Sequence, residues 1–393
     1  MKTMKWKFYS LAFVAGMSIL TACSSDDNND NDGNGGNGNG NEIENGTILK
    51  GTITSDVTLA AGNTYKLSGE YIVEEGATLH IEEGVKIIAV YDDIADYILV
   101  KQGGKINAVG TPDKPIVMTS EKEEPGAWGG IHICGRAHTN AEGGKGSSEI
   151  GGAVYGGNDD ADNSGTLQYI RLEYTGFAFD EEHKANGISF YGVGNGTIVD
   201  HCQAYKGSDD GFEFFGGSVN VSNLVAVSCS DDSFDWTEGW NGKGTNLVAY
   251  QEAESTLGYD CDCLMECDNN GSNNAATPVA HPVLKNLILV GNGGSKQGIR
   301  LRAGTEVEID NAKVCGKGQP LTVETALTEN ALKNGTSKLT NITLTSELSC
   351  KEGIYTHADF IAVTSNKVDA NLSYSSFEDI KKECSWMNGN WVK

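Results

Sequence analysis

A short pattern recurs through the second half of the chain at intervals close to 22 residues. Each copy has Asn or, once, His, followed by an apolar residue, a free position and a second apolar residue. Two apolar residues two positions apart point to the same side of a β-strand. A strand that returns at a fixed interval predicts a solenoid whose coils stack on one another. The copies are DHCQA at 200–204, SNLVA at 222–226, TNLVA at 245–249, KNLIL at 285–289, DNAKV at 310–314 and TNITL at 340–344.

The interval holds over long distances. His201 and Asn223 are 22 positions apart, and Asn223 and Asn311 are 88 apart, which is four such intervals. An Asn at the same place in each coil predicts an asparagine ladder, in which side-chain amides of stacked turns bond one another. A second set of short strands recurs in the same coils, at 187–190, 211–214, 233–236 and 298–301. Several short strands per coil of about 22 residues predict an all-β fold, a single-stranded parallel β-helix, because a β-sandwich would not hold this spacing.

The same alternation at 75–85 and 103–110 extends the solenoid towards the N-terminus. Residues 46–393 are therefore expected to form one continuous β-helix, with short coils over 46–126 and main coils over 127–350. Residues 351–393 lose the repeat. The aromatic residues of this last stretch are expected to cap the open end, where strand edges would otherwise stay unpaired. They are Phe360, Phe377, Trp386 and Trp391.

The first residues predict export. Three lysines precede a short apolar run at 11–20, and LTAC at 20–23 resembles the lipobox of bacterial lipoproteins. That resemblance implies a signal peptide over 1–22 and lipidation on Cys23. Residues 23–45 are rich in Gly, Asn and Asp and are expected to form a flexible tether. The acidic start of this tether resembles the surface-export signal of Bacteroidota-type lipoproteins, which implies a lipid anchor in the outer membrane facing the cell exterior.

The charge balance excludes one class of partner. The chain has 54 acidic and 29 basic residues, for a net charge of −25. Nucleic acids require a cationic surface, so no nucleic-acid partner is expected. Calcium and neutral glycans remain compatible with this charge. Ten cysteines include Cys23, and CDCLMEC at 261–267 is too tightly spaced for a four-thiolate zinc site, so at least one disulfide is expected there.

Three segments resemble a group of bacterial surface lipoproteins with a right-handed, pectate-lyase-like β-helix. They are WGGIHICGRA at 128–137, YGGNDDADNSGTL at 155–167, and KGSDDGFEFFGG at 206–217 with its echo SDDSFDW at 230–236. The resemblance implies a right-handed helix and a surface location. It implies no chemistry, because the wider superfamily includes polysaccharide lyases, glycoside hydrolases, adhesins and scaffolds.

The repeat predicts two columns of polar side chains. If Phe212 and Phe214 point inward, Glu213 points outward, and stacking the coils extends this outward column. Its expected members are Ser189, Glu213, Asp235, Gly258 and Arg300. A second column, at the turn that enters each strand, places Asp209 over Asp231 and Asp210 over Asp232, with neighbours about 4.8 Å apart at the backbone.

Stacked carboxylates repel one another, and three arrangements would compensate. The aspartates cap turns by accepting backbone N–H groups. Alternatively, calcium takes oxygen ligands from neighbouring coils, with Asp209, Asp210, Asp231 and Asp232 as the ligands. In the third arrangement one carboxyl keeps its proton and forms an acid beside a base. All three stay open at the level of sequence.

An enzyme would use the same residues. Asp209, Asp210, Asp231 and Asp232 could supply the acid and base of a glycoside hydrolase, and SDDG resembles the paired aspartates of β-helix polygalacturonases. The Gly-His-Gly segment of those enzymes is missing, which argues against a hydrolase. A calcium-assisted lyase would need a base, and Arg300 is the well-placed candidate.

Other side chains are assigned from their neighbours. Trp236 is expected to pack inward, whereas Trp240 in a glycine-rich turn is expected to be exposed. His132 is expected on the surface. The longest breaks in the coil pattern, 138–165 and 260–282, are expected to cover or build the functional face.

The sequence therefore predicts a surface-tethered lipoprotein that binds a glycan or another extracellular ligand, with calcium ordering its acidic turns. The ligand-binding residues expected are Glu213, Asp235, Trp240 and Arg302. A calcium-assisted polysaccharide lyase or a glycoside hydrolase is the enzyme alternative. A structural adhesin or a partner in an outer-membrane complex is the third.

Overall fold

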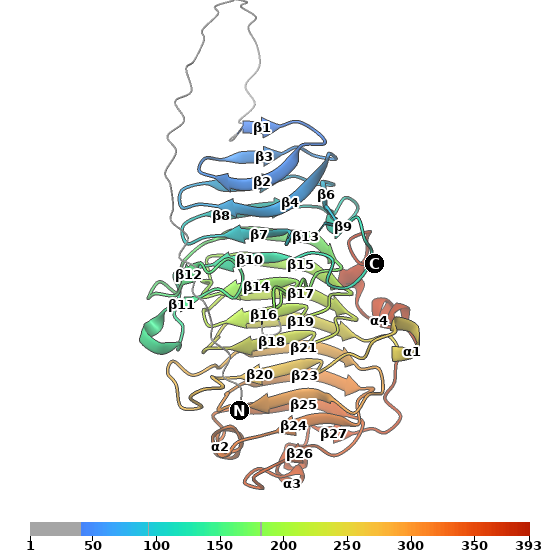
Figure 1. Ribbon diagram of the computed structural model, residues 1–393. Coiled ribbons are helices and arrows are strands. Elements are labelled where there is room, and N and C mark those ends of the chain that lie inside the picture. Colours follow the sequence, from blue (N-terminus) through green and yellow to red (C-terminus); the bar gives the residue numbers. More distant parts are fainter. Residues whose placement is uncertain (1–40, 93, 181–182) are drawn as a thin grey trace, which may run out of the picture. The chain divides into compact units, whose positions relative to one another are not determined.

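The computed structural model describes residues 41–92, 94–180 and 183–393. Within these residues the chain winds as a parallel β-helix, with successive coils stacked along one axis (Figure 1). Three stacks of parallel strands, here named faces A, B and C, form its walls. The first paired strand already begins at Asn41, inside the stretch expected to be tether.

Faces B and C meet at a bend within one long strand per coil. Face B begins with β1 (Asn41–Ile43), β3 (Val57–Leu59), β5 (Thr78–Ile81) and β8 (Lys105–Val109). Face C begins with the first parts of β2 (Ile48–Ile53) and β4 (Thr64–Val73), which are followed by β6 (Lys86–Ala89) and β9 (Ile116–Ser120). From there each coil contributes a strand that serves both faces: β13 (Gly165–Glu173), β15 (Ile198–Tyr205), β17 (Asn220–Val227), β19 (Lys243–Tyr250), β21 (Val283–Val290), β23 (Glu308–Cys315) and β25 (Lys338–Leu344). Face C ends with β27 (Lys367–Val368).

Face A is the third wall. After the ends of β2 and β4, it contains β7 (Tyr97–Val100), β10 (Ile131–Cys134), β14 (Ile188–Tyr191), β16 (Phe212–Phe215), β18 (Phe234–Thr237), β20 (Met265–Asp268), β22 (Gln297–Arg302), β24 (Gln319–Val323) and β26 (Ser349–Cys350). All these pairings are parallel, and the β2–β4 pairing contains one register shift, between Leu49 and Gly51. The repeat predicted from the sequence is therefore confirmed.

The asparagine ladder lies at the bend between faces B and C. The residue at the bend has a left-handed φ in every coil from β13 onward, at Tyr169, His201, Asn223, Asn246, Asn286, Asn311 and Asn341, with φ between 52° and 62°. Asn tolerates this conformation better than most residues. Its side chain also bonds the coil before it: Nδ2 of Asn246 donates to Oδ1 of Asn223 at 2.8 Å, and Nδ2 of Asn286 donates to Oδ1 of Asn246 at 3.0 Å. The ladder is confirmed.

Aromatic rings stack inside the helix. Phe190 lies over Phe214 with ring centroids 5.0 Å apart, and Phe212 lies over Phe234 at 5.6 Å. These rings come from equivalent positions of adjacent coils and are at most 2% exposed. Together with the aliphatic side chains of the other coils, these rings form one continuous core along the axis.

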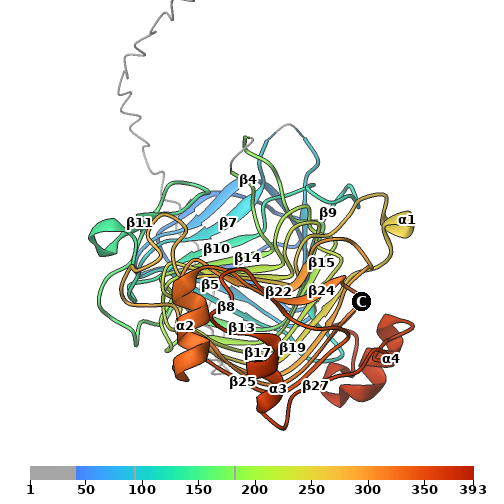
Figure 2. The same cartoon turned by 90° about the horizontal axis from the view of Figure 1, so that it is seen from below.

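The last part of the chain packs in two different places. Leu332 of α2 (Ala326–Asn334), Phe360 of α3 (His357–Ala362) and Tyr355 just before α3 pack against the end of the main core, so this part forms the expected cap. Figure 2 looks along the axis and shows α2 and α3 across this end, with α4 (Phe377–Glu383) at the side.

The prediction that Phe377, Trp386 and Trp391 cap the end is wrong, because they pack on the outer side of face C. The apolar outward residues of that face, such as Val225 and Val290, need this cover. We name residues 369–393 the strap. It returns along face C until Asn390 N–H donates to Pro112 O at 2.7 Å and Nζ of Lys393 lies 3.3 Å from Glu173 Oε2.

Two further excursions leave the coils. The loop 138–165 contains the 3₁₀ turn at Glu142–Gly144 and a small hairpin of β11 (Gly146–Ser147) and β12 (Val154–Tyr155). The insertion before β20 begins with α1 (Glu254–Leu257), and a second 3₁₀ turn at Ser385–Met387 lies in the strap. Among the described residues, no helix is both long enough and apolar enough to cross a membrane.

Candidate functional site

The outward side of face A carries a column of ionisable side chains. Phe212 and Phe214 point into the core, so Glu213 between them points outward, as predicted. The register places Glu213 beside Asp235, and Asp235 beside Glu266. The next coil continues with Arg300.

The predicted member Gly258 is wrong, and Glu266 takes its place. Residues 251–264 leave the wall before β20 begins, so the coil between Asp235 and Glu266 is 31 residues long rather than about 22. Gly258 ends α1 with a left-handed φ of 81°. The sequence did contain a signal for Glu266, because Met265-Glu266-Cys267 has the same apolar–acidic–apolar pattern as the strands above it.

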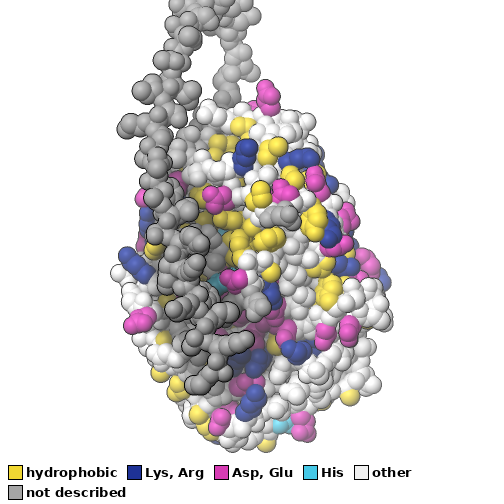
Figure 3. Space-filling model, viewed as in Figure 1, with side chains coloured by type: hydrophobic (Ala, Val, Ile, Leu, Met, Phe, Trp, Pro, Cys, Tyr) yellow, Lys and Arg dark blue, Asp and Glu magenta, His cyan; other side chains and the backbone are white. Residues whose placement is uncertain are grey.

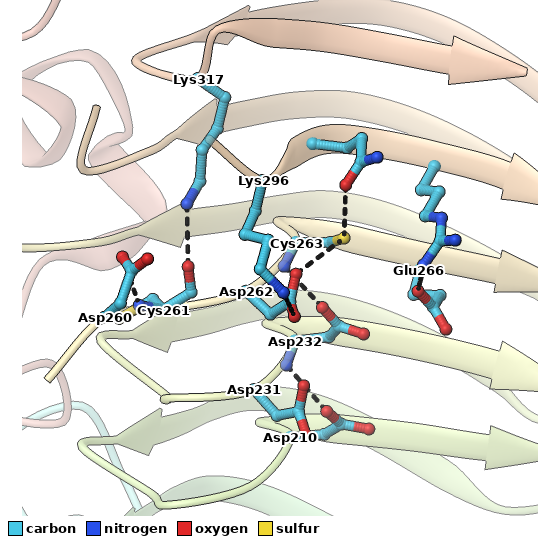
Figure 4. A network of polar contacts seen from close by, with 12 residues as sticks. Asp210, Asp231, Asp232, Asp260, Cys261, Asp262, Cys263, Glu266, Lys296 and Lys317 are labelled. Carbon is cyan, nitrogen blue, oxygen red and sulfur yellow. Dashed lines mark hydrogen bonds and ion pairs between the residues drawn. The ribbon is translucent and has the colours of Figure 1, made fainter. Parts of the chain in front are cut away.

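Asp210 and Asp232 form the second predicted column, at the turn that enters face A. Oδ1 of Asp210 accepts the backbone N–H of Asp232 at 2.8 Å, and Oδ1 of Asp232 accepts that of Cys263 at 2.6 Å (Figure 4). Above them, Oδ1 of Asn186 accepts the N–H of Asp210 at 3.2 Å. The turn-capping interpretation is therefore confirmed for one oxygen of each aspartate.

The remaining pair, Asp209 and Asp231, lies nearer to solvent. Nζ of Lys184 is 3.6 Å from Asp209 and 3.9 Å from Asp231, so one lysine serves both carboxylates. Burial, followed by the charge of Asp231, raises the pKa of Asp209 to about 7. Lys184 opposes this rise only in part. Asp209 is therefore partly protonated near neutral pH.

The two columns interleave into what we name the carboxylate row: Asp210, Glu213, Asp232, Asp235 and Glu266. Carboxylate oxygens of Asp210, Glu213 and Asp235 lie within 4.8 Å of one another, and so do those of Asp232, Asp235 and Glu266. Asp235 belongs to both groups. Its Oδ1 is shielded from solvent and has no hydrogen-bond partner among the described residues.

Burial is the main cause of the unusual acidity of the row. It raises the pKa of Asp210, Glu213, Asp232 and Asp235 well above the usual range, and neighbouring carboxylates add to the rise. Burial also raises the pKa of Glu266, although the nearby Arg302 and Arg300 reduce the effect. Without a cation, the row therefore holds protons at pH values where exposed carboxylates have lost them.

Arginines close one end of the row. Arg300 bonds Glu266 at 2.8 Å and Glu324 at 3.1 Å, and Arg302 bonds Glu266 at 2.7 Å and Asp268 at 2.7 Å. Burial lowers the pKa of Arg300, but Glu324 and Glu266 outweigh it and raise the pKa above its usual value. A guanidinium held charged in this way does not accept a proton, which argues against Arg300 as the base of a lyase.

The space-filling view agrees with this arrangement. Acidic side chains gather midway along the face seen in Figure 3, and Lys and Arg side chains lie below them. The charge pattern also includes four residues for which the sequence predicted no role: Lys184, Glu266, Asp268 and Glu324.

The donor set of the row suits a calcium ion. Calcium takes six to eight oxygen ligands at about 2.3–2.6 Å, so two oxygens on one ion are at most about 5 Å apart. Each of the two triads meets this limit. The shielded and unpartnered Oδ1 of Asp235 is the kind of atom that a cation would satisfy. Asp235, Glu213 and Asp210, or Asp235, Asp232 and Glu266, could therefore hold calcium.

These two sets of possible ligands differ from the predicted calcium ligands in one respect. The groups that can share an ion include the predicted Asp209, Asp210 and Asp231, but two others recruit Glu213, Asp235 and Glu266 from the strand column. The side chain of Asp231 is 42% exposed, whereas Asp232 as a residue is 5% exposed. The buried positions, rather than the outer pair, form the centre of the site.

The prediction that Trp240 is exposed is wrong, so its ring is not offered to a ligand at the surface. It is 1% exposed and stacks on Phe214 with ring centroids 4.1 Å apart. The glycine-rich turn directs it inward, because Glu238 and Gly239 both have positive φ. Trp236 is also 1% exposed, and its inward packing is confirmed.

His132 points outward from face A, yet it is not on the surface. It is fully buried between Tyr97 and Tyr191, with ring centroids 6.1 and 6.3 Å away. Burial lowers its pKa to about 4, so it stays neutral. The loop 138–165 covers this part of the face through Ile150, Ala153 and Tyr155, as expected of such an excursion.

The predicted disulfide is absent from the described residues, where all nine cysteines are free. Cys267 packs into the core in register with Trp236 and Leu301, while Cys261 and Cys263 lie in the turn before that strand. Cys23 lies outside the described residues, so its lipidation stays a prediction.

Comparisons with known proteins agree with this architecture. Residues 51–393 match the family described as "Pectate-lyase like beta helix domain". No curated protein matches the chain. Among solved structures, the chain is similar to the Dettilon tailspike protein at 9% sequence identity and a TM-score of 0.30, over 75% of this chain and 55% of the tailspike.

The chain thus spans about half the length of that structure, and so low a score adds nothing to the argument. The family match covers most of the sequence, including every coil that contributes to the carboxylate row. The protein belongs to the pectate-lyase-like β-helix family.

Proposed function

We propose that this protein binds an extracellular polysaccharide on face A and that a calcium ion in the carboxylate row completes the binding surface. The observation that carries the proposal is the pair of carboxylate triads that share Asp235. Five buried or half-buried carboxylates in one cluster are costly unless they share protons or a cation. In an exported protein, extracellular calcium would be available to fill this role.

The surroundings of the row favour a sugar polymer as the ligand. With calcium in place, the row offers a cation to the carboxylate of an acidic sugar, while unbound edges of Asp209 and Asp231 can accept hydroxyl groups. Phe179, 38% exposed, packs edge-on against Tyr97 of β7 at 5.8 Å between ring centroids. An exposed aromatic ring on the same face is a suitable surface for the apolar side of a sugar ring.

Cleavage of the polysaccharide is the second candidate. It is favoured by the pKa of Asp209, which burial raises to about 7, and by ionisable neighbours within reach. A protonated carboxyl beside an ionised one is the pair that glycoside hydrolysis requires. Two glutamates hold Arg300 charged, so it cannot act as the base that a lyase needs. If the protein cleaves its ligand, hydrolysis is therefore favoured over elimination.

The proposal includes the location predicted from the sequence, with Cys23 carrying a lipid anchor in the outer membrane and the β-helix facing the cell exterior. What supports it is the lipobox-like LTAC and the acidic residues after it. Globomycin treatment and palmitate labelling of the full chain and of Cys23→Ala would test the anchor. A full chain that takes up no label would contradict it.

Retention on immobilised polysaccharides tests the binding function. The chain without residues 1–23 is applied to a panel of acidic and neutral polysaccharides, with calcium or with chelator. We expect retention in calcium, release by chelator, and loss of retention in Asp235→Asn. The matched control Glu347→Gln removes an exposed carboxylate far along the chain and should be retained like the wild type.

Product analysis of the same incubations separates binding from cleavage. New reducing ends would identify a hydrolase, unsaturated ends a lyase, and their absence a binding protein. No calcium binding by calorimetry, together with no retention on any polysaccharide, would refute the proposal and favour the adhesin or complex partner.

A further inference from the structure

A second polar pocket lies on the other side of the helix from the strands of face A, where the strap passes the asparagine ladder. Its volume is about 310 Å³. The β-helix supplies ladder asparagines and Lys313, and the strap supplies Glu383 and Trp386. The residues that matter for its chemistry are Asn246, Asn286, Asn311, Lys313, Glu383 and Trp386.

The ladder leaves one amide oxygen unused at this pocket. Nδ2 of Asn311 donates to Oδ1 of Asn286 at 2.8 Å, which continues the ladder. The next amide breaks the pattern, because Nδ2 of Asn341 donates to Asp310 at 2.6 Å instead. Oδ1 of Asn311 therefore receives no donor from the described residues, and Asn311 is exposed. It is a free acceptor at the rim of the pocket.

Trp386 provides an aromatic surface that is already fixed in place. Its ring contacts His201 and Trp391 at centroid distances of 6.4 and 6.1 Å. The other four tryptophans of the described residues are at most 1% exposed, whereas Trp386 is half-buried. A ring held by neighbours on one side and open on the other loses little entropy when a ligand stacks on it.

The polar groups of the pocket are balanced in charge. Lys313 forms an ion pair with Glu383, which also accepts the hydroxyl of Tyr374 at 2.8 Å. Burial alone would raise the pKa of Glu383, but bonds from Lys313 and Tyr374 outweigh this and lower it, so the carboxylate stays charged. Donors and acceptors without net charge suit hydroxyl groups, each of which can donate and accept.

We propose that this pocket binds a neutral sugar ring, which stacks on Trp386 and bonds the amide of Asn311 and the Lys313–Glu383 pair. An aromatic ring beside a few convergent polar groups is typical of small-ligand sites, and about 300 Å³ is their lower size limit. One or two sugar rings therefore fit. None of the pocket residues belongs to face A, so this site is independent of the carboxylate row.

Tryptophan fluorescence gives a specific test. Residues 39–393 form a compact unit of their own, so the chain without residues 1–23 is used, which also removes Trp6. Trp386 is then the one tryptophan open to acrylamide. We expect cellobiose, maltose or N,N′-diacetylchitobiose to reduce its quenching about twofold when the pocket is saturated, with a dissociation constant in the millimolar range typical of a single stacked ring.

Saturation-transfer NMR with the same three sugars gives a second readout that does not depend on fluorescence. Trp386→Ala should abolish the transfer and Glu383→Gln should reduce it, whereas Glu347→Gln, an exposed carboxylate outside both sites, should leave it unchanged. Circular dichroism confirms that each variant is folded. The proposal is overturned if none of the sugars gives transfer with the wild type, or if folded Trp386→Ala gives the same transfer.

Discussion

Replacing Asp235 by Asn tests the calcium site most directly, because this residue belongs to both carboxylate triads. The substitution keeps the shape of the side chain and removes its charge. In the absence of calcium, we expect Asp235→Asn to be more stable than the wild type. The reason is that Asp235, buried among carboxylates whose oxygens lie within 4.8 Å, must at neutral pH either repel them as an anion or take up a proton, and both destabilise the folded state.

The size of the effect follows from that distance. Two unit charges 4.8 Å apart repel one another by about 3 kcal/mol at an effective dielectric constant of about 20. Because part of the row is protonated, we count a single ionised pair. A gain of about 3 kcal/mol in the free energy of unfolding raises the melting temperature by roughly 5 °C in a protein of this size.

Calcium should cancel most of the difference in stability between the two proteins. An ion at 100 times its dissociation constant stabilises the wild type by about 2.7 kcal/mol, and Asp235→Asn should lose most of this gain. Thermal melting by circular dichroism at neutral pH, in chelator and in millimolar calcium, measures both effects. Glu347→Gln is the control, because it removes an exposed carboxylate and should change neither value.

Two results would refute this reasoning. If Asp235→Asn melts below the wild type in chelator, the carboxylate is needed as a structural acceptor, and losing that acceptor costs more than relieving the repulsion gains. If calcium stabilises Asp235→Asn as much as the wild type, the ion binds elsewhere or without this residue.

Three further predictions follow from the fold. Without divalent cations, the free energy of unfolding should fall as the pH rises from about 4 to about 7, because the pKa of Asp209 is raised to about 7 and the folded state therefore binds more protons than the unfolded state in this range. Urea titrations that show stability rising with pH would contradict this prediction. Trp240→Ala should cost about 3–5 kcal/mol in chemical denaturation without altering calcium affinity, whereas an unchanged stability would mean that the ring is dispensable to the core. Asn246→Ala should cost about 1–3 kcal/mol, since it loses ladder bonds and keeps a strained left-handed φ of 60°, and Asn246→Gly should recover part of that loss; equal stability of the two variants would exclude the backbone contribution.

The periodic parts of the structure could be predicted from the sequence because each coil repeats the same constraint. Asn223 and Asn246 occupy equivalent bends, so their stacking follows from the interval alone. The same holds for Glu213 beside Asp235. Once the interval was known, the alternation of inward and outward side chains decided which carboxylates would meet.

The remaining features depend on interruptions of the repeat. Gly258 was assigned to the outward column because the interval was carried through an insertion, and the register shifted to Glu266 instead. Trp240 points inward because the backbone of one turn has positive φ, which a glycine-rich sequence permits but does not require. Lys184 reaches Asp209 from another coil, and no local pattern predicts such a contact.

The strap has a consequence for how the solenoid opens. In a solenoid each coil contacts its two neighbours, so the ends can unravel without disturbing the middle. Here, however, residues 369–393 connect the last coils to early ones, through the bonds of Asn390 to Pro112 and of Lys393 to Gln203. Fraying from the C-terminal end must first detach a segment held over the whole length of face C between these points. Coils far apart in the sequence should therefore exchange their amide protons together, as one cooperative unit.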